Sequence, residues 1–345
     1  MSDLPTGSDA GAAEPPGAPT IYDVARLAGV SPSTVSRALS TPGRLSAKTE
    51  QLVRETAEQL GFRVNASARA LPTGRTMTLA LLLADITNPV VFGIVRGAER
   101  AAAAAGYTLV IAESQESGPA ERATALRVAS SVDGIVFATS RLDSEALREL
   151  ARLKPAVLIN REVTGLPSIV PDVDQGVIEL VEHLHRLGHV NVGYLAGPPS
   201  SWVDRRRWAA LLQHGRTRGL RMFEIPGGEP TLDGGTAAFE RVAASPATAV
   251  VAFNDLMAIG LLRAARRAGL DVPGALSIAG FDDIFGSELT TPTITTVAAP
   301  LEQAGEQAVQ LLLARMGQPD AGAGAFPPFP TRLIARGSTG ILATG

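Results

Sequence analysis

Polar and charged side chains recur where the apolar runs of this sequence end. They are Asp85, Asn88, Asn160, Arg161, Asn254, Asp255, Asp282 and Asp283. Carboxylate, amide and guanidinium groups at the ends of buried strands suit a hydroxyl-rich ligand, because such a ligand needs donors and acceptors at several angles. Each of them could instead cap the helix that follows, and for Asp255 and Asp283 both interpretations stay open.

A second set of chemically useful residues lies in DVARLAGVSPSTVSRAL, residues 23–39. Ser33 and Arg37 stand one helical turn apart, and the planar fork of an arginine matches the two acceptor atoms of guanine. These residues predict contacts to base edges. The alternative is a plain helical hairpin with a solvated face.

Other patterns predict no catalytic or metal chemistry. His183, His185 and His189 resemble a metal cluster, but the first two point to different faces of a helix and Gly188 ends that helix before the third. No glycine-rich dinucleotide motif follows a strand, and no serine-histidine-aspartate arrangement stands out. The chain contains no cysteine, which excludes disulfides and thiolate metal sites. We expect no enzyme activity and no cofactor.

The elements that position Arg37 are two short helices joined at Gly29. Thr20 and Asp23 have the spacing of a capping box, and Val24 and Leu27 give the first helix an apolar face. Gly29 supplies a left-handed exit.

Ser31 caps the second helix, with Pro32 at its first position. Val35 and Leu39 face inward, whereas Ser33, Thr34 and Arg37 face outward. A third helix begins at Ser46, contains Val53 and Leu60, and ends at Gly61. This pattern predicts a helix-turn-helix that presents its second helix to the major groove.

Charge supports a nucleic-acid partner for this segment. Residues 20–76 carry eight Lys and Arg against four Asp and Glu, on a chain of net charge −3. Residues 1–19 are rich in Pro, Gly, Ala and acid, and we expect a disordered tail without a secretory signal. No apolar run approaches the roughly 18 residues that span a bilayer.

From Thr78 onward, strand and helix patterns alternate. Apolar runs typical of strands buried on both faces are separated by helix-like segments, and a second set begins near Asp174. We expect two doubly wound parallel sheets, with ligands at the carboxyl ends of the strands between two lobes.

TIYDVARLAGVSPSTVSRALS and SAKTEQLVRETAEQLGFRVNASARAL resemble the headpiece of the lactose-repressor (LacI/GalR) family of bacterial transcription regulators. The resemblance extends over nearly the whole chain. It implies base contacts from Pro32, Ser33 and Arg37, and phosphate contacts from Thr20, Tyr22, Ser31, Thr34, Ser36 and Asn65. Ser40 replaces the asparagine usual in the family, and Val64 replaces the usual proline.

The segment NASARAL, residues 65–71, predicts a hinge helix too short to be stable alone. The resemblance implies that two such helices pair in the minor groove, where Leu71 wedges a base step and Ala68 and Arg69 also contact DNA. A plain linker helix with Leu71 packed on the body is the alternative.

The body resembles the periplasmic-binding-protein-like core of the same family. The resemblance implies a headpiece at 20–61, a hinge and linker at 62–76, and two lobes: 77–172 with 301–331, and 173–300 with 332–345. It also implies effector contacts from Asp85, Asn88, Val90, Val91, Asn160, Arg207, Asn254 and Asp282. Family members usually carry aromatic residues in place of Val90 and Val91, and commonly glutamine in place of Ala299.

These patterns together predict a cytoplasmic, ligand-responsive repressor. It would act as a homodimer on pseudo-palindromic operator DNA, with a sugar or related effector bound between the lobes. A sugar-binding transport receptor and an enzyme with a Rossmann-like core are the alternatives from other classes.

Overall fold

The computed structural model describes residues 19–40, 43–62, 75–317 and 329–342. The chain divides into two compact units, residues 1–76 and residues 77–345. Within the described residues, no helix combines the length and apolar character needed to cross a membrane.

The first unit contains three helices: α1 (Ile21–Ala28), α2 (Pro32–Ser40) and α3 (Ala47–Gln59). Each packs against the other two, and their small core is centred on Val24, Val35, Ala38 and Val53, which are fully buried. The predicted three-helix headpiece is therefore confirmed.

The predicted helix ends of the headpiece are also present. The backbone N–H of Thr20 donates to the Asp23 carboxylate at 3.0 Å, and Gly29 has a φ of 65°. Ser31 Oγ accepts from the N–H of Thr34 at 3.2 Å, and Ser46 Oγ accepts from Thr49 in the same way. These bonds satisfy donors that a helix start leaves free.

The prediction that Leu27 faces the core is wrong. The residue is 53% exposed, and the apolar face of α1 consists of Val24, Ala25 and Ala28. At about 100° per residue, Leu27 lies roughly 100° from the centre of that stripe, outside the contact with α2 and α3.

The second unit begins with a parallel sheet in the order β2-β1-β3-β4-β5. Its strands are β1 (Thr78–Leu83), β2 (Thr108–Glu113), β3 (Gly134–Ala138), β4 (Ala156–Ile159) and β5 (Ser168–Ile169). In β1, Leu79, Leu81 and Leu83 pack into one core cluster, whereas Ala80 and Leu82 pack into another on the opposite face. This central strand is buried on both faces, as its continuous apolar sequence predicts.

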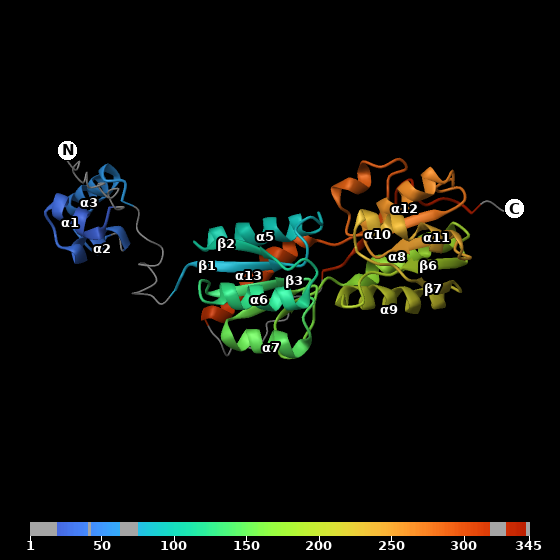
Figure 1. The fold of residues 1–345 in the computed structure, drawn as a ribbon, viewed down its shortest axis with the longest axis horizontal. Helices are drawn as coiled ribbons and strands as arrows, with labels where there is room; N and C mark the ends of the chain where they lie inside the picture. Colours follow the sequence, from blue (N-terminus) through green and yellow to red (C-terminus); the bar gives the residue numbers. More distant parts are fainter. Residues whose placement is uncertain (1–18, 41–42, 63–74, 318–328, 343–345) are drawn as a thin grey trace, which may run out of the picture. The chain divides into compact units, whose positions relative to one another are not determined.

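Helices cover both faces of this first sheet (Figure 1). They are α5 (Val91–Ala104) and α13 (Leu301–Gly317) on one face, and α6 (Gly118–Ala129) and α7 (Ser144–Leu153) on the other. α5 and α13 pack closely because of two glycines: a Cβ at Gly97 would lie 1.8 Å from the Glu302 carbonyl oxygen, and one at Gly305 would lie 2.1 Å from that of Ile94. A segment from the end of the chain thus completes the first lobe.

The second sheet has the order β11-β10-β9-β8-β6-β7. Its strands are β6 (Asn191–Leu195), β7 (Arg221–Ile225), β8 (Ala249–Ala252), β9 (Ser277–Phe281), β10 (Thr295–Ala298) and β11 (Arg332–Ile334). All neighbours are parallel except β10 and β11. The expectation of wholly parallel sheets is corrected at this edge, where the returning chain pairs with β10 in the reverse direction.

Helices flank the second sheet as well (Figure 1). They are α8 (Val173–Arg186), α9 (Trp202–Thr217), α10 (Leu232–Ala237), α11 (Phe239–Ala243), α12 (Asp255–Arg267) and the 3₁₀ helix η1 (Phe285–Glu288). α8 packs on α9, and α10 packs on α12. The loops after β1, β4 and β9, together with α9, carry polar residues of the cleft described next.

Candidate DNA-binding surface and ligand cleft

The predicted DNA-contacting residues of the headpiece gather on α2 and at the start of α1. All of these residues are exposed except Thr34, which is half-buried. The set consists of Thr20, Tyr22, Ser31, Pro32, Ser33, Thr34, Ser36 and Arg37. Ser31 Oγ lies 2.8 Å from Ser33 Oγ and 2.9 Å from Thr34 Oγ1. Asn65, Ala68, Arg69 and Leu71 lie outside the described residues.

Arg37 lies along the exposed side of α2. Its Nε donates to the Ser33 carbonyl oxygen at 3.3 Å, and one terminal nitrogen lies 3.5 Å from Ser33 Oγ. No carboxylate among the described residues pairs with Arg37, so its guanidinium can turn toward a base edge without breaking an ion pair. The surface combines small hydroxyl groups, one guanidinium and the exposed Tyr22 ring, which suits contacts to phosphates and to guanine.

Seven of the eight predicted effector residues line one pocket between the two sheets of the second unit. The lining residues are Ala84, Asp85, Asn88, Val90, Val91, Glu116, Thr139, Arg141, Asn160, Ser201, Val203, Arg207, Pro230, Phe253 and Asp282. The pocket encloses about 40 Å³ of open space, little more than one water molecule occupies. It adjoins a pocket of similar volume that shares Asn160, Arg207 and Asp282, and a larger one of about 790 Å³ that shares Asp85, Glu116 and Pro230.

Arg207 and Asp282 form the charged centre of this pocket. A terminal nitrogen of Arg207 contacts Asp282 Oδ1 at 2.5 Å, and the other donates to the Phe253 carbonyl oxygen, also at 2.5 Å. The side chains of the pair are 12% and 8% exposed. The guanidinium also stands 4.5 Å from the centre of the Phe281 ring, so aromatic faces help to hold it in place.

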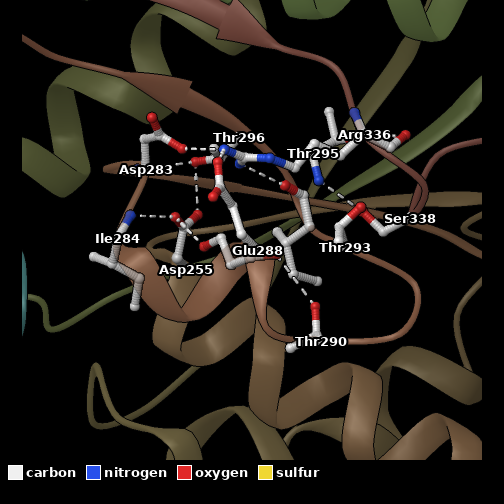
Figure 2. A network of polar contacts seen from close by, with 12 residues as sticks. Asp255, Asp283, Ile284, Glu288, Thr290, Thr293, Thr295, Thr296, Arg336 and Ser338 are labelled. Carbon is white, nitrogen blue, oxygen red and sulfur yellow. Dashed lines mark hydrogen bonds and ion pairs between the residues drawn. The ribbon is translucent and has the colours of Figure 1, made fainter.

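Asp282 and Asp283 both adopt left-handed backbone conformations, with φ of 103° and 53°. Such angles cost non-glycine residues energy and persist where the surroundings enforce them. Here the enforcement comes from Asp255, whose carboxylate accepts from the N–H of Ile284 at 3.1 Å and from Ser287 Oγ and Thr296 Oγ1, both at 2.7 Å (Figure 2).

Asp255 is completely buried, and that burial raises the pKa of its carboxyl to about 7. The negative charge of Asp282 adds to the rise, and the hydrogen bonds to Asp255 oppose it. Asp255 therefore acts on the cleft indirectly, by fixing the loop that carries Asp282. Neither of the two roles predicted for it, a side-chain helix cap or a ligand contact, describes these bonds.

Asp283 points away from the pocket toward the end of the chain. One terminal nitrogen of Arg336 contacts Asp283 Oδ1 at 2.7 Å and Glu288 Oε1 at 2.8 Å, as Figure 2 shows. Arg336 also donates to the Ile294 carbonyl oxygen at 3.0 Å. The loop after β9 is thereby tied to the segment that follows β11.

Asn254 is the predicted effector residue that the structure does not place among the pocket's lining residues. It is buried, its Oδ1 accepts from the N–H of Met257 at 2.9 Å, and its Nδ2 donates to the Pro230 carbonyl oxygen at 2.9 Å. Both side-chain polar groups are thus engaged within the protein. Asn254 caps α12 and holds the loop of Pro230, which does line the pocket.

Sequence reasoning missed a second ion pair in the pocket. Arg141, with a side chain 5% exposed, contacts Glu116 at 2.5 Å and donates to the Thr139 carbonyl oxygen at 2.9 Å. Both residues follow strand ends, β2 for Glu116 and β3 for Arg141, and that position is the signal that could have identified them.

His183, His185 and His189 were not expected to bind a metal ion together, and the hydrogen bonds of His183 and His189 go to different residues. His183 bonds to Thr339 at 2.8 Å, and the buried His189 bonds to Thr248 and Ser277. Burial lowers the pKa of both imidazoles. In the part of the chain that the structure describes, no three His, Asp or Glu residues come together as a metal site.

A helix-turn-helix headpiece joined to a two-lobed body with a polar cleft defines a ligand-responsive, DNA-binding transcription regulator. Residues 20–65 match the model of bacterial regulatory proteins of the lacI family, and residues 181–339 match a periplasmic binding protein-like domain. The chain is 33% identical to the transcriptional repressor CytR of Escherichia coli K12, covering 94% of this chain and 97% of CytR. This protein belongs to the LacI family.

Other relatives agree with this assignment. The chain is 34% identical to the transcriptional regulator DegA of Bacillus subtilis, over 84% of this chain and 88% of DegA. A crystal structure of the Lac repressor dimer bound to operator and the anti-inducer ONPF matches 93% of this chain and 99% of its own, with a TM-score of 0.82 and 26% identity. The regulator CelR in complex with cellobiose matches over the same shares with a TM-score of 0.66 and 27% identity. These relatives are transcription regulators rather than enzymes.

Proposed function

We propose that this protein is a homodimeric repressor that releases or engages a pseudo-palindromic operator when a small hydroxyl-rich effector, a sugar or a related molecule, binds its cleft. The observation that carries the proposal is the convergence of Arg207, Asp282, Asn160, Asp85 and Asn88 on one pocket between the sheets. We further propose that the chain acts in the cytoplasm and catalyses no reaction.

On DNA, α2 enters the major groove and Ser33 and Arg37 contact base edges. Thr20, Tyr22, Ser31, Thr34, Ser36 and Asn65 contact phosphates, Pro32 contacts a base, and Ala68, Arg69 and Leu71 act in the minor groove. The exposure of the headpiece members of this set supports these roles. Two headpieces on a two-fold symmetric dimer call for two inverted half-sites.

The effector binds between a first lobe, 77–172 with 301–331, and a second lobe, 173–300 with 332–345. The packing of α13 on α5 and the pairing of β11 with β10 support these boundaries. An effector in this pocket contacts residues of both lobes, so its binding is coupled to the angle between them. A LacI family regulator from Enterococcus faecium solved with bound ribose and the regulator CelR solved with cellobiose support a sugar as the effector class.

The first lobe also offers a surface for the partner protomer. β2 is an edge strand whose Val110 and Ile111 are 41% and 39% exposed, although the other strands of that sheet are largely buried. An exposed apolar edge strand is normally covered, and a second copy of this chain would cover it.

A thermal-shift screen tests the effector assignment. The full chain is heated with a panel of sugars and nucleosides, with and without a DNA duplex that it binds. A true effector raises the Tm of the parent and changes its affinity for the duplex, but does neither for Arg207→Ala. If a compound raises the Tm of parent and variant equally, it binds outside the cleft.

A further inference from the structure

Arg207 lies on α9 between two residues that contact the same buried side chain. Asp204 precedes Arg207 by about one helical turn, and its Oδ1 accepts from the Tyr194 hydroxyl at 2.8 Å. Trp208 follows Arg207 directly, and its ring stacks on the Tyr194 ring with centroids 5.6 Å apart and planes 9° apart. Tyr194 belongs to β6 and is fully buried. One residue of the sheet therefore holds α9 on both sides of Arg207.

The carboxylate of Asp204 does not serve the end of its own helix. Ser201 caps α9 by accepting from the N–H of Asp204 at 3.2 Å, and a closed capping box would have Asp204 accept from the N–H of Ser201 in return. That N–H donates instead to the Pro198 carbonyl oxygen at 2.8 Å. Asp204 Oδ1 accepts from the N–H of Gly197 at 2.7 Å as well as from Tyr194. The carboxylate thus joins the first turn of α9 to the end of β6.

Gly197 extends this connection to the aromatic ring beside Arg207. A Cβ at Gly197 would lie 2.5 Å from the Phe253 ring, so the close packing of this loop requires glycine. The centre of the Phe253 ring stands 5.2 Å from the guanidinium carbon of Arg207, and the Phe253 carbonyl oxygen accepts from Arg207 at 2.5 Å. The same guanidinium contacts Asp282 at 2.5 Å. Tyr194 is therefore connected to the ion pair of the cleft through α9 and through the loop after β6.

We propose that Tyr194 and Asp204 are positioning residues, which fix the place of Arg207 and thereby strengthen its ion pair with Asp282. An arginine side chain gives up much conformational freedom when it pairs, so a backbone held in place reduces the cost of forming the pair. Neither Tyr194 nor Asp204 is among the lining residues of the pocket, so both act through Arg207. Their part in the response to an effector rests on the proposed function, whereas their effect on the ion pair does not.

The test is the coupling between Arg207 and Asp282, measured without effector in the full-length protein. Urea unfolding of a double-mutant cycle, Arg207→Ala with Asp282→Asn, gives this coupling in the parent and in each variant background. A general loss of stability cancels within the cycle, so a merely structural role would leave the coupling unchanged. Tyr194→Phe keeps the stacked ring and removes only the hydroxyl donor, and we expect it to lower the coupling by about half. Asp204→Ala should lower the coupling at least as much.

Two further backgrounds distinguish position from charge and from helix capping. Asp204→Asn keeps a side-chain oxygen that can accept from Tyr194 and Gly197, so it should retain the parent coupling. Asp143→Ala is the matched control, because Asp143 caps α7 in the other lobe by accepting from the N–H of Ala146 at 2.8 Å. It should also leave the coupling unchanged.

Three results would overturn the proposal. The first is a parent without coupling between Arg207 and Asp282, or with a coupling that Tyr194→Phe leaves intact. The second is an Asp204→Asn background that loses as much coupling as Asp204→Ala, because Asp204 would then act through its charge. The third is an equal loss in Asp143→Ala. Since no effector is present, these results are independent of the thermal-shift screen that tests the proposed function.

Discussion

Replacing Arg207 with alanine should lower the stability of the folded protein, because it removes one partner of the buried ion pair in the cleft. In Arg207→Ala the buried Asp282 carboxylate, whose side chain is 8% exposed, loses its 2.5 Å partner and remains close to the Asp255 carboxyl. The Phe253 carbonyl oxygen loses its donor as well. Removing one partner of a buried ion pair typically lowers the free energy of unfolding by about 3–5 kcal/mol. Because the Arg207 side chain is 12% exposed, we expect about 3 kcal/mol.

The assay is urea unfolding of the parent, Arg207→Ala, Asp282→Asn and the double variant. In the double variant the stranded charge is gone, so the loss should fall short of the sum of the single losses by about 2 kcal/mol. Affinity for DNA without effector should not change, because the headpiece is a separate compact unit. Strictly additive losses would refute the argument, since they would mean that the two side chains do not interact in solution.

Three further predictions concern other parts of the molecule. The pKa of Asp255 is raised from 3.8 to about 7, so the stability that this carboxyl contributes is fully present below pH 3.8 and is lost as the pH rises through 7. In urea unfolding, the free energy of unfolding of the parent relative to Asp255→Asn should fall by up to about 1.4 kcal/mol per pH unit across that window. If the free energies of unfolding of the two proteins depend on pH in the same way, burial does not raise this pKa. Arg37→Ala should cost about 1–3 kcal/mol on a selected duplex and little on random DNA, with Arg26→Ala as the exposed control; equal losses on both duplexes in fluorescence anisotropy would instead indicate a phosphate contact. Leu71→Ala should reduce duplex bending, followed by energy transfer between labelled ends, and an unchanged bend would exclude the wedge.

The cleft could be predicted from the sequence because its strands are recognisable as continuous apolar runs. The carboxyl ends of parallel strands meet at one edge of a sheet, so the sequence alone predicts that Asp85, Asn160 and Asp282 lie near one cleft. What the pattern could not supply was the direction of each side chain. Asn254 also follows a strand, yet its amide turns back to Met257 and Pro230, a choice made by the following helix and loop.

Other features depend on contacts between distant segments. The pairing of Arg141 with Glu116 joins two loops 25 positions apart, and no local periodicity encodes it. β11 pairs antiparallel because the chain returns from the first lobe to the second. The exposure of Leu27 follows from where α2 and α3 meet α1, which the amphipathic pattern of one helix does not determine.

Selection from a random duplex library is the most direct test of the central claim, that this chain is a sequence-specific regulator with two symmetry-related reading helices. The full-length protein is used to enrich duplexes over several rounds, and the enriched pool is sequenced. We predict an inverted repeat whose two half-sites lose enrichment together when Arg37→Ala replaces the parent. A pool without a shared sequence, or one with a single unrepeated half-site, would contradict it.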